Sequence, residues 1–179
     1  MNYHYTPAEL KELLSSMTII VDSRENSWKH VEDYFIKKKI QYKQHKLDYG
    51  DYSCMLPKNL ELGILRDTYF TDLVCIERKN SLTELSNNLS NDRDRFVSEL
   101  LRKKDTKLFL MVENTAGGYG DILSHKYNSQ YGEASFMATL KSMEAQFNIN
   151  VSFLADKSLA PVFIFSTLYY HIRNYLLGR

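Results

Sequence analysis

Residues 73–79 read LVCIERK, a short apolar run that ends in one acid and two bases. An apolar run of this length that contains β-branched residues predicts a buried β-strand. Successive side chains of a strand point to opposite faces, so Glu77 and Lys79 are expected on one face and Arg78 on the other. The segment therefore predicts a strand that brings a carboxylate and an ammonium group to one place.

A second acid stands upstream, in Gly50-Asp51-Tyr52, which opens another strand-like stretch. If the two strands are neighbours, Asp51 and Glu77 meet and Lys79 lies beside them. Carboxylate oxygens are ligands that Mg²⁺ prefers, and a cation held in this way acts on phosphate groups. An isolated Glu-x-Lys is more often an exposed strand end with a surface ion pair. The buried run before it and the upstream Gly-Asp-Tyr favour the metal-dependent phosphodiesterase site.

A third acidic cluster, Asp22-Ser23-Arg24-Glu25, directly follows the expected strand at residues 18–21. Ligands bind at strand ends in α/β sheets, so Asp22 and Glu25 are positioned to extend the acidic site. The alternative is a polar turn between a strand and a helix. Carboxylates repel one another unless a cation lies between them, so three such clusters in one chain favour a shared site.

Strand and helix patterns alternate along the rest of the chain. Expected strands cover residues 18–21, 40–47, 51–56, 72–77, 107–113 and 149–154, and expected helices cover 7–15, 28–38, 82–100 with a break near 91, 133–147 and 159–177. Residues 114–132 are rich in glycine and are expected to form a mobile loop. This order predicts an α/β fold in which helices cover both faces of a central sheet.

The composition is that of a globular protein of 179 residues with a net charge of +1. No apolar run approaches the ~18 residues of a membrane span, and the N-terminus lacks a signal-peptide pattern. Both cysteines fall in expected strands, where buried, reduced thiols are usual. We therefore expect a cytoplasmic or nucleoid-associated protein that is neither secreted nor bound to a membrane.

Taken together, the three clusters resemble the XPF-type (xeroderma pigmentosum group F) structure-specific endonuclease domain of the restriction-endonuclease-like superfamily. The matching residues are Gly50, Asp51, Glu77, Arg78 and Lys79, with Asp22, Arg24 and Glu25 after the first strand and Arg93 as the helix arginine. The resemblance implies a restriction-endonuclease-like mixed sheet over residues 18–179. It leaves residues 1–17 as an N-terminal extension with a short helix. The helix-hairpin-helix module of many relatives is not expected within the chain.

The resemblance also implies an activity: Mg²⁺-dependent endonuclease cleavage of branched or flapped DNA at single-strand/double-strand junctions, with Mn²⁺ as a substitute. It implies that the metal is held by Asp51, Glu77 and Asp22, and that Lys79 joins them in catalysis by assisting water activation. The residues that it implies as supporting or phosphate-contacting are Arg24, Glu25, Arg78 and Arg93.

The chain departs from the family pattern in two places. The acid that follows the lysine is shifted to Glu84, which also pairs with Ser81 in a capping box and so has a structural role first. The long separation of Asp51 and Glu77 predicts a hairpin extension over residues 60–71 beside the site.

Three short basic clusters are candidates for phosphate contacts. Residues 37–39 and 102–104 are read first as solvated helix ends, because bases there stabilise the helix dipole. Arg93 and Arg95 are the better phosphate candidates, since they lie near the expected site.

The helix at 159–177 carries more apolar surface than one helix face needs, and relatives dimerise through such elements. We therefore expect a homodimer through the C-terminal helices, with a helix buried on both sides of the monomer as the alternative. The competing function is a non-catalytic DNA-binding or scaffold subunit, which the joint presence of Asp51, Glu77 and Lys79 disfavours. A nuclease that acts on RNA is a third, weaker option.

Overall fold

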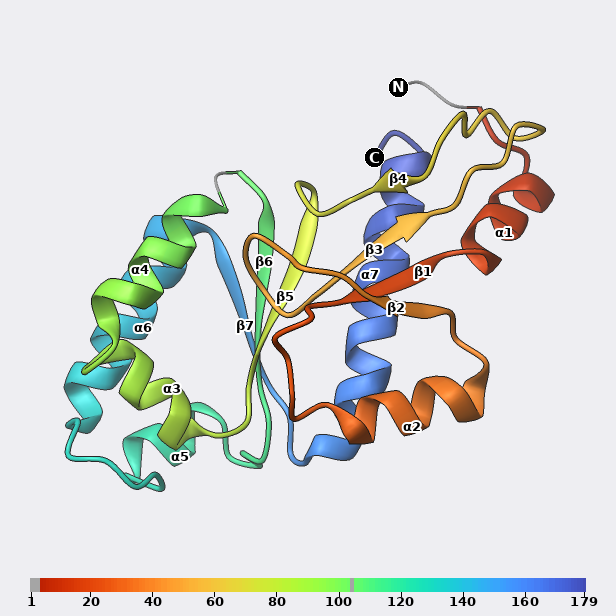
Figure 1. Ribbon diagram of the computed structural model, residues 1–179. Coiled ribbons are helices and arrows are strands. Elements are labelled where there is room, and N and C mark those ends of the chain that lie inside the picture. Colours follow the sequence, from red (N-terminus) through yellow and green to blue (C-terminus); the bar gives the residue numbers. More distant parts are fainter. Residues whose placement is uncertain (1–3, 104) are drawn as a thin grey trace.

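The computed structural model describes residues 4–103 and 105–179. A seven-stranded mixed sheet forms the centre, in the order β2-β1-β3-β5-β6-β7 with β4 added to β3 (Figure 1). The pairs β1–β2, β5–β6 and β6–β7 are parallel, whereas β3 is antiparallel to β1, β4 and β5. The strands are β1 (Thr18–Val21), β2 (Tyr42–Gln44), β3 (Tyr52–Leu56), β4 (Thr68–Tyr69), β5 (Val74–Lys79), β6 (Lys107–Val112) and β7 (Ile149–Phe153).

Helices cover both faces of this sheet, as expected (Figure 1). On one face lie α1 (Pro7–Ser15), α2 (Lys29–Lys38) and α7 (Ala160–Leu176), with the short 3₁₀ helix η1 (Lys157–Leu159) before α7. On the other lie α3 (Leu82–Leu89), α4 (Arg93–Arg102), α5 (Tyr119–Leu123) and α6 (Glu133–Phe147). Two apolar cores result, one on each side of the sheet. None of these described helices is long and apolar enough to cross a membrane.

Helix α1 begins as its sequence predicts. The Thr6 hydroxyl accepts a hydrogen bond from the Glu9 N–H, and the Glu9 carboxylate accepts one from the Thr6 N–H, which completes a capping box. The apolar face of α1 then packs into the same core as α7. Residues 1–3 of the expected N-terminal extension lie outside the described residues, and the boundary at residue 18 stays a prediction.

Two segments differ from expectation, and a third agrees with it. Strand β2 is shorter than residues 40–47, because the chain leaves the sheet after His45 donates its N–H to the Val21 carbonyl. Residues 114–132 are folded rather than irregular, since they contain α5, and Asp121 accepts hydrogen bonds from the Gly117 N–H and the Thr115 hydroxyl. The helical pattern at 82–100 does break near residue 91, into α3 and α4.

The hairpin extension is present, but its tip lies elsewhere than expected. Strand β4 pairs with Met55 and Leu56, at the end of β3 remote from Asp51. The residues on either side of β4 contact the N-terminal segment and α7 instead: the Tyr5 hydroxyl donates to the Leu62 carbonyl before β4, and the ring of Phe70 after β4 packs edge-on against Tyr175. Residues 60–67 therefore extend the sheet away from the site (Figure 1).

Candidate active site

The three acidic clusters meet where β1, β3 and β5 lie side by side. The Asp22 N–H donates to the Asp51 carbonyl at 2.8 Å, and the Asp51 N–H donates to the Ile76 carbonyl at 2.8 Å. The Asp51 carboxylate accepts the Arg78 N–H at 2.7 Å, directly after Glu77. The antiparallel pairing of β3 with its two neighbours thus places acids from three distant segments at one end of the sheet.

Asp51, Glu77 and Lys79 line one cavity of about 240 Å³. The Lys79 ammonium donates to Glu77 Oε1 at 2.6 Å and lies 5.2 Å from the centre of the Phe96 ring. Burial alone would lower the pKa of Lys79, but the negative charge of Glu77 and its hydrogen bond outweigh that effect and raise it. Lys79 is therefore a fixed positive charge and not a neutral base.

The same pair of carboxylates has the character of a divalent-cation site. Burial, and then the charge of Glu77, raise the pKa of Asp51 well above its ordinary value. Hard oxygen donors of this kind suit Mg²⁺, which usually takes only one or two carboxylates and completes its shell with water and phosphate oxygens. Among the described residues, no group of three or more acids, histidines and cysteines is arranged to hold a metal. The residues present fit a cation held by Asp51 and Glu77 alone.

Asp22, expected as a third metal ligand, is engaged otherwise. Asp22 Oδ1 accepts hydrogen bonds from the backbone N–H and the side-chain Nε of Arg24. Asp22 Oδ2 accepts hydrogen bonds from Arg24 Nη2 and from the Leu47 N–H. All four donor–acceptor distances lie between 2.7 and 2.9 Å. Burial would raise the pKa of Asp22, but these donors outweigh it and lower the pKa. With both oxygens occupied, Asp22 ties the loop at residues 45–50 to the end of β1, and this favours a positioning role over metal ligation.

Arg78 lies on the other side of β5, as the alternation predicts. Its guanidinium binds Glu113 in a two-pronged ion pair, with Nε–Oε1 at 3.0 Å and Nη2–Oε2 at 2.9 Å. The ring of His30 contacts the same Glu113 at 2.9 Å. This buried network supports β5 from behind, and so Arg78 holds the site through Glu113, although it also lines a second cavity together with Asp51 and Glu77.

Glu113 and His30 are the residues that sequence reasoning missed. Glu113 ends the apolar run of β6 as Glu77 ends that of β5, and the parallel register places it next to Lys79, whose carbonyl accepts the Glu113 N–H at 2.8 Å. That repeated pattern of an acid after a buried strand was the available signal. No such sequence pattern marks His30, because its position depends on how α2 packs.

Two further acids lie at the edges of the site. Glu25 lines the same cavity as Asp51, accepts the Ser27 N–H at 2.7 Å and lies 3.5 Å from Arg78 Nη1. Glu84 accepts the Asn80 N–H at 2.8 Å, and its own N–H donates to the Ser81 hydroxyl. Glu84 therefore stabilises the start of α3, but only the Ser81 half of the expected capping box forms, because the Glu84 carboxylate binds the Asn80 N–H instead of the Ser81 N–H.

A family model described as the ERCC4 domain matches residues 21–164. The chain belongs to the ERCC4 domain family. This confirms the XPF-type assignment made from the motifs. A comparison with curated proteins gave no match.

Two solved structures show which fold this ERCC4 domain shares. XPF from Aeropyrum pernix is similar with a TM-score of 0.59 and 18% identity, over 86% of this chain and 60% of that one. XPF from Aeropyrum pernix in complex with DNA is similar with a TM-score of 0.59 and 19% identity, over 86% and 63%. The chain thus spans less than two thirds of these proteins. At this identity the likeness supports the fold alone, and it confirms the restriction-endonuclease-like α/β sheet.

The basic residues that reach the site of this ERCC4 domain come from one face of α4. Arg95 and Arg102 line the cavity that contains Asp51, together with Arg24 from the β1 end. Arg93 is exposed and is not among the lining residues of that cavity. Arg95 is therefore the better placed of the two arginines for a phosphate contact, and Arg102 is more than a solvated helix end.

Asn88, on α3, also lines this cavity of the ERCC4 domain, and its Oδ1 is buried without a hydrogen-bond partner among the described residues. A buried acceptor left unpaired costs about 1–3 kcal/mol, so a bound water or substrate group is the expected partner. We predict that Asn88→Leu, which is of similar size, leaves the free energy of unfolding unchanged or raises it by about 1 kcal/mol while it slows phosphodiester cleavage. Urea unfolding and single-turnover cleavage rates test this together. A destabilised variant with unchanged cleavage contradicts it.

Proposed function

We propose that this ERCC4 domain is a Mg²⁺-dependent DNA endonuclease that hydrolyses phosphodiester bonds. The observation that carries the proposal is the convergence of Asp51, Glu77 and Lys79 on one cavity, with the pKa of Asp51 raised by burial and by its acidic neighbour. Two carboxylates forced together next to a fixed ammonium favour a cation that compensates their charge. Membership of the ERCC4 family, and the XPF relative whose structure is in complex with DNA, support DNA as the substrate.

Each residue has a distinct task in this proposal. Asp51 and Glu77 hold the metal, which when bound neutralises phosphate charge and lowers the pKa of a water molecule. Lys79, fixed by Glu77 and by the Phe96 ring, orients the attacking water or stabilises charge on the phosphate. Arg95 and Arg102 neutralise phosphates that flank the scissile one.

The finer features of the proposal concern substrate shape and assembly. By resemblance to the family, we propose branched or flapped DNA as the substrate and a homodimer through α7. The outward face of α7 supports the dimer, because Val162 and Tyr170 stay 47% and 58% exposed while its inner face is buried. Sedimentation velocity at two protein concentrations tests the dimer, which a monomer at every concentration would contradict.

Cleavage assays on a panel of substrates test the activity. Flap, fork, duplex and single-stranded DNA, with matched RNA substrates, are incubated with Mg²⁺, with Mn²⁺ or with a chelator. The expected result is cutting of flap or fork DNA with either metal and none with the chelator. Binding without cutting on every DNA substrate identifies a scaffold subunit instead, and preferential cutting of RNA reassigns the substrate.

A further inference from the structure

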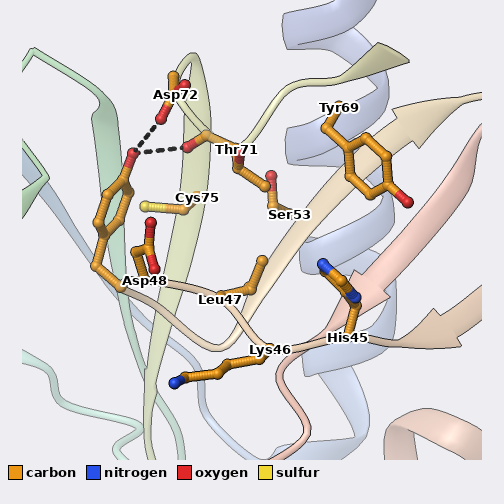
Figure 2. A pocket seen from close by; sticks show the side chains of 10 residues that line it. His45, Lys46, Leu47, Asp48, Ser53, Tyr69, Thr71, Asp72 and Cys75 are labelled. Atoms are coloured by element: carbon orange, nitrogen blue, oxygen red, sulfur yellow. Dashed lines mark hydrogen bonds between the residues drawn. The ribbon is translucent and has the colours of Figure 1, made fainter. Parts of the chain in front are cut away.

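A groove leads from the candidate active site along the sheet to β4. The cavity with Asp51 shares Arg24, Asp48, Tyr49 and Arg102 with a second cavity of about 740 Å³. That cavity in turn shares the 46–49 loop and Asp72 with a third, of about 300 Å³, drawn in Figure 2. We name the second and third cavities together the side groove.

The side groove lies beside the part of the sheet formed by β1 and β3, and the end of α4 borders it at Arg102. The small apolar cluster beneath it consists of Ile20 from β1, Met55 from β3 and Leu47 from the loop. The loop itself is fixed at both ends. Leu47 is bound to Asp22 and Arg24, while the Tyr49 hydroxyl donates to the Thr71 carbonyl at 2.9 Å and lies 2.7 Å from the Thr106 hydroxyl. The groove is therefore a preformed surface continuous with the site.

Two aromatic rings face this surface, Tyr69 from β4 and His45 from the segment after β2. Figure 2 shows Tyr69 and His45 next to each other on the same side of the third cavity, where their tilted rings are in contact with ring centres 5.8 Å apart. Tyr69 is 41% exposed, and its hydroxyl accepts a hydrogen bond from Lys43 at 2.8 Å, which fixes the ring. A half-exposed ring that is already held in one orientation suits stacking of a nucleobase, because the side chain loses little further conformational entropy when the base binds.

The charged residues that line the side groove favour binding of a single strand over a duplex. Four basic residues line the groove, and so do three acids. The basic residues are Arg24, Lys46, Arg102 and Lys103, and the acids are Asp48, Asp72 and Asp105. Such a nearly balanced surface is weak for a double helix, whose binding depends on many neutralised phosphates. Stacking needs bases that are free of a partner strand, and each stacked base adds about 1–3 kcal/mol to what the phosphate contacts supply.

We propose that the side groove binds an unpaired DNA arm and leads it to the phosphate held at Asp51 and Glu77. The arm stacks on Tyr69 and His45, and Lys46 and Arg102 neutralise its phosphates. The inference rests on the proposed function for the destination of the arm. Binding of the arm, however, is measured without cleavage, so the two proposals fail separately.

Fluorescence anisotropy with a chelator present tests the groove. A labelled duplex with an unpaired arm of about 15 nucleotides is compared with the same duplex lacking the arm. Tyr69→Ala is expected to weaken binding of the armed duplex by about 5-fold or more and to leave the armless duplex unchanged, since one stacked base contributes at least ~1 kcal/mol. Tyr69→Phe keeps the ring but loses the hydroxyl that Lys43 holds, so it should lose much less affinity than Tyr69→Ala.

Two controls separate stacking from charge and from misfolding. With an arm of abasic nucleotides, the loss caused by Tyr69→Ala should disappear, because only the phosphates remain. Lys46→Ala should weaken binding of normal and abasic arms alike. Lys37 on α2 is also exposed, and Lys37→Ala should weaken binding of neither arm. Two results would overturn the proposal: Tyr69→Ala loses the same affinity for the armed and the armless duplex, or it keeps full affinity for the armed duplex.

Discussion

Glu77→Gln is expected to reduce metal-dependent cleavage by about 1,000-fold or more while DNA binding is retained. The change keeps the size of the side chain but removes a charged oxygen ligand and the partner of the Lys79 ammonium, 2.6 Å away. Metal and electrostatic catalysis each supply several kcal/mol of barrier lowering, and about 4 kcal/mol corresponds to a factor of 1,000. Binding should be unchanged or slightly stronger, because a negative charge near the phosphate is lost.

Single-turnover cleavage and anisotropy on one flap substrate measure the two effects of Glu77→Gln separately. Glu84→Gln is the matched control, since Glu84 lies at the neighbouring edge of the site but its carboxylate caps the Asn80 N–H. It should change stability and activity little, because the amide oxygen of glutamine can still accept the Asn80 N–H. A cleaving Glu77→Gln variant would contradict the metal site, and an equal loss in Glu84→Gln would make the shifted acid a catalyst.

The parts of the site that sequence could predict are those set by local pattern. The buried run before Glu77 fixes β5, and the two-residue period fixes which way Glu77, Arg78 and Lys79 point. The order of strands and helices was enough for the α/β class. Asp51 was placed beside Glu77 because an apolar strand follows it, and the antiparallel pairing of β3 and β5 brings the two together.

The parts that could not be predicted depend on contacts between distant segments. Asp22 carries the same strand-end signature as a metal ligand, and only the position of the Leu47 N–H, 25 residues away, reveals that its oxygens are occupied. Arg93 and Arg95 are equivalent in the sequence, but the rotation of α4 turns Arg95 toward the cavity. The tip of the hairpin is placed by β4 pairing and by contacts with α7, neither of which leaves a local pattern.

The buried ion pair behind β5 should be a large determinant of stability. Glu113 is fully buried, and the Arg78 side chain is 6% exposed. Glu113→Leu is similar in size but leaves the guanidinium without its main partner, so we expect the free energy of unfolding to fall by about 3 kcal/mol. Glu25 lies 3.5 Å from Arg78 Nη1 and still compensates part of its charge, so the expected loss of stability lies at the lower end of the range for a broken buried ion pair. Urea unfolding measures it.

A double-mutant cycle identifies the cause of that loss. Arg78→Met strands the Glu113 carboxylate and should also destabilise, whereas Arg78→Met with Glu113→Leu removes both charges and should be more stable than either single variant. Asp33→Ala breaks an exposed ion pair with Lys29 and should cost less than about 1 kcal/mol. If Glu113→Leu were as mild as Asp33→Ala, the network would not support β5. Because the Arg78 N–H also holds the Asp51 carboxylate, the double variant further shows whether a stable β5 is sufficient for cleavage without the ion pair.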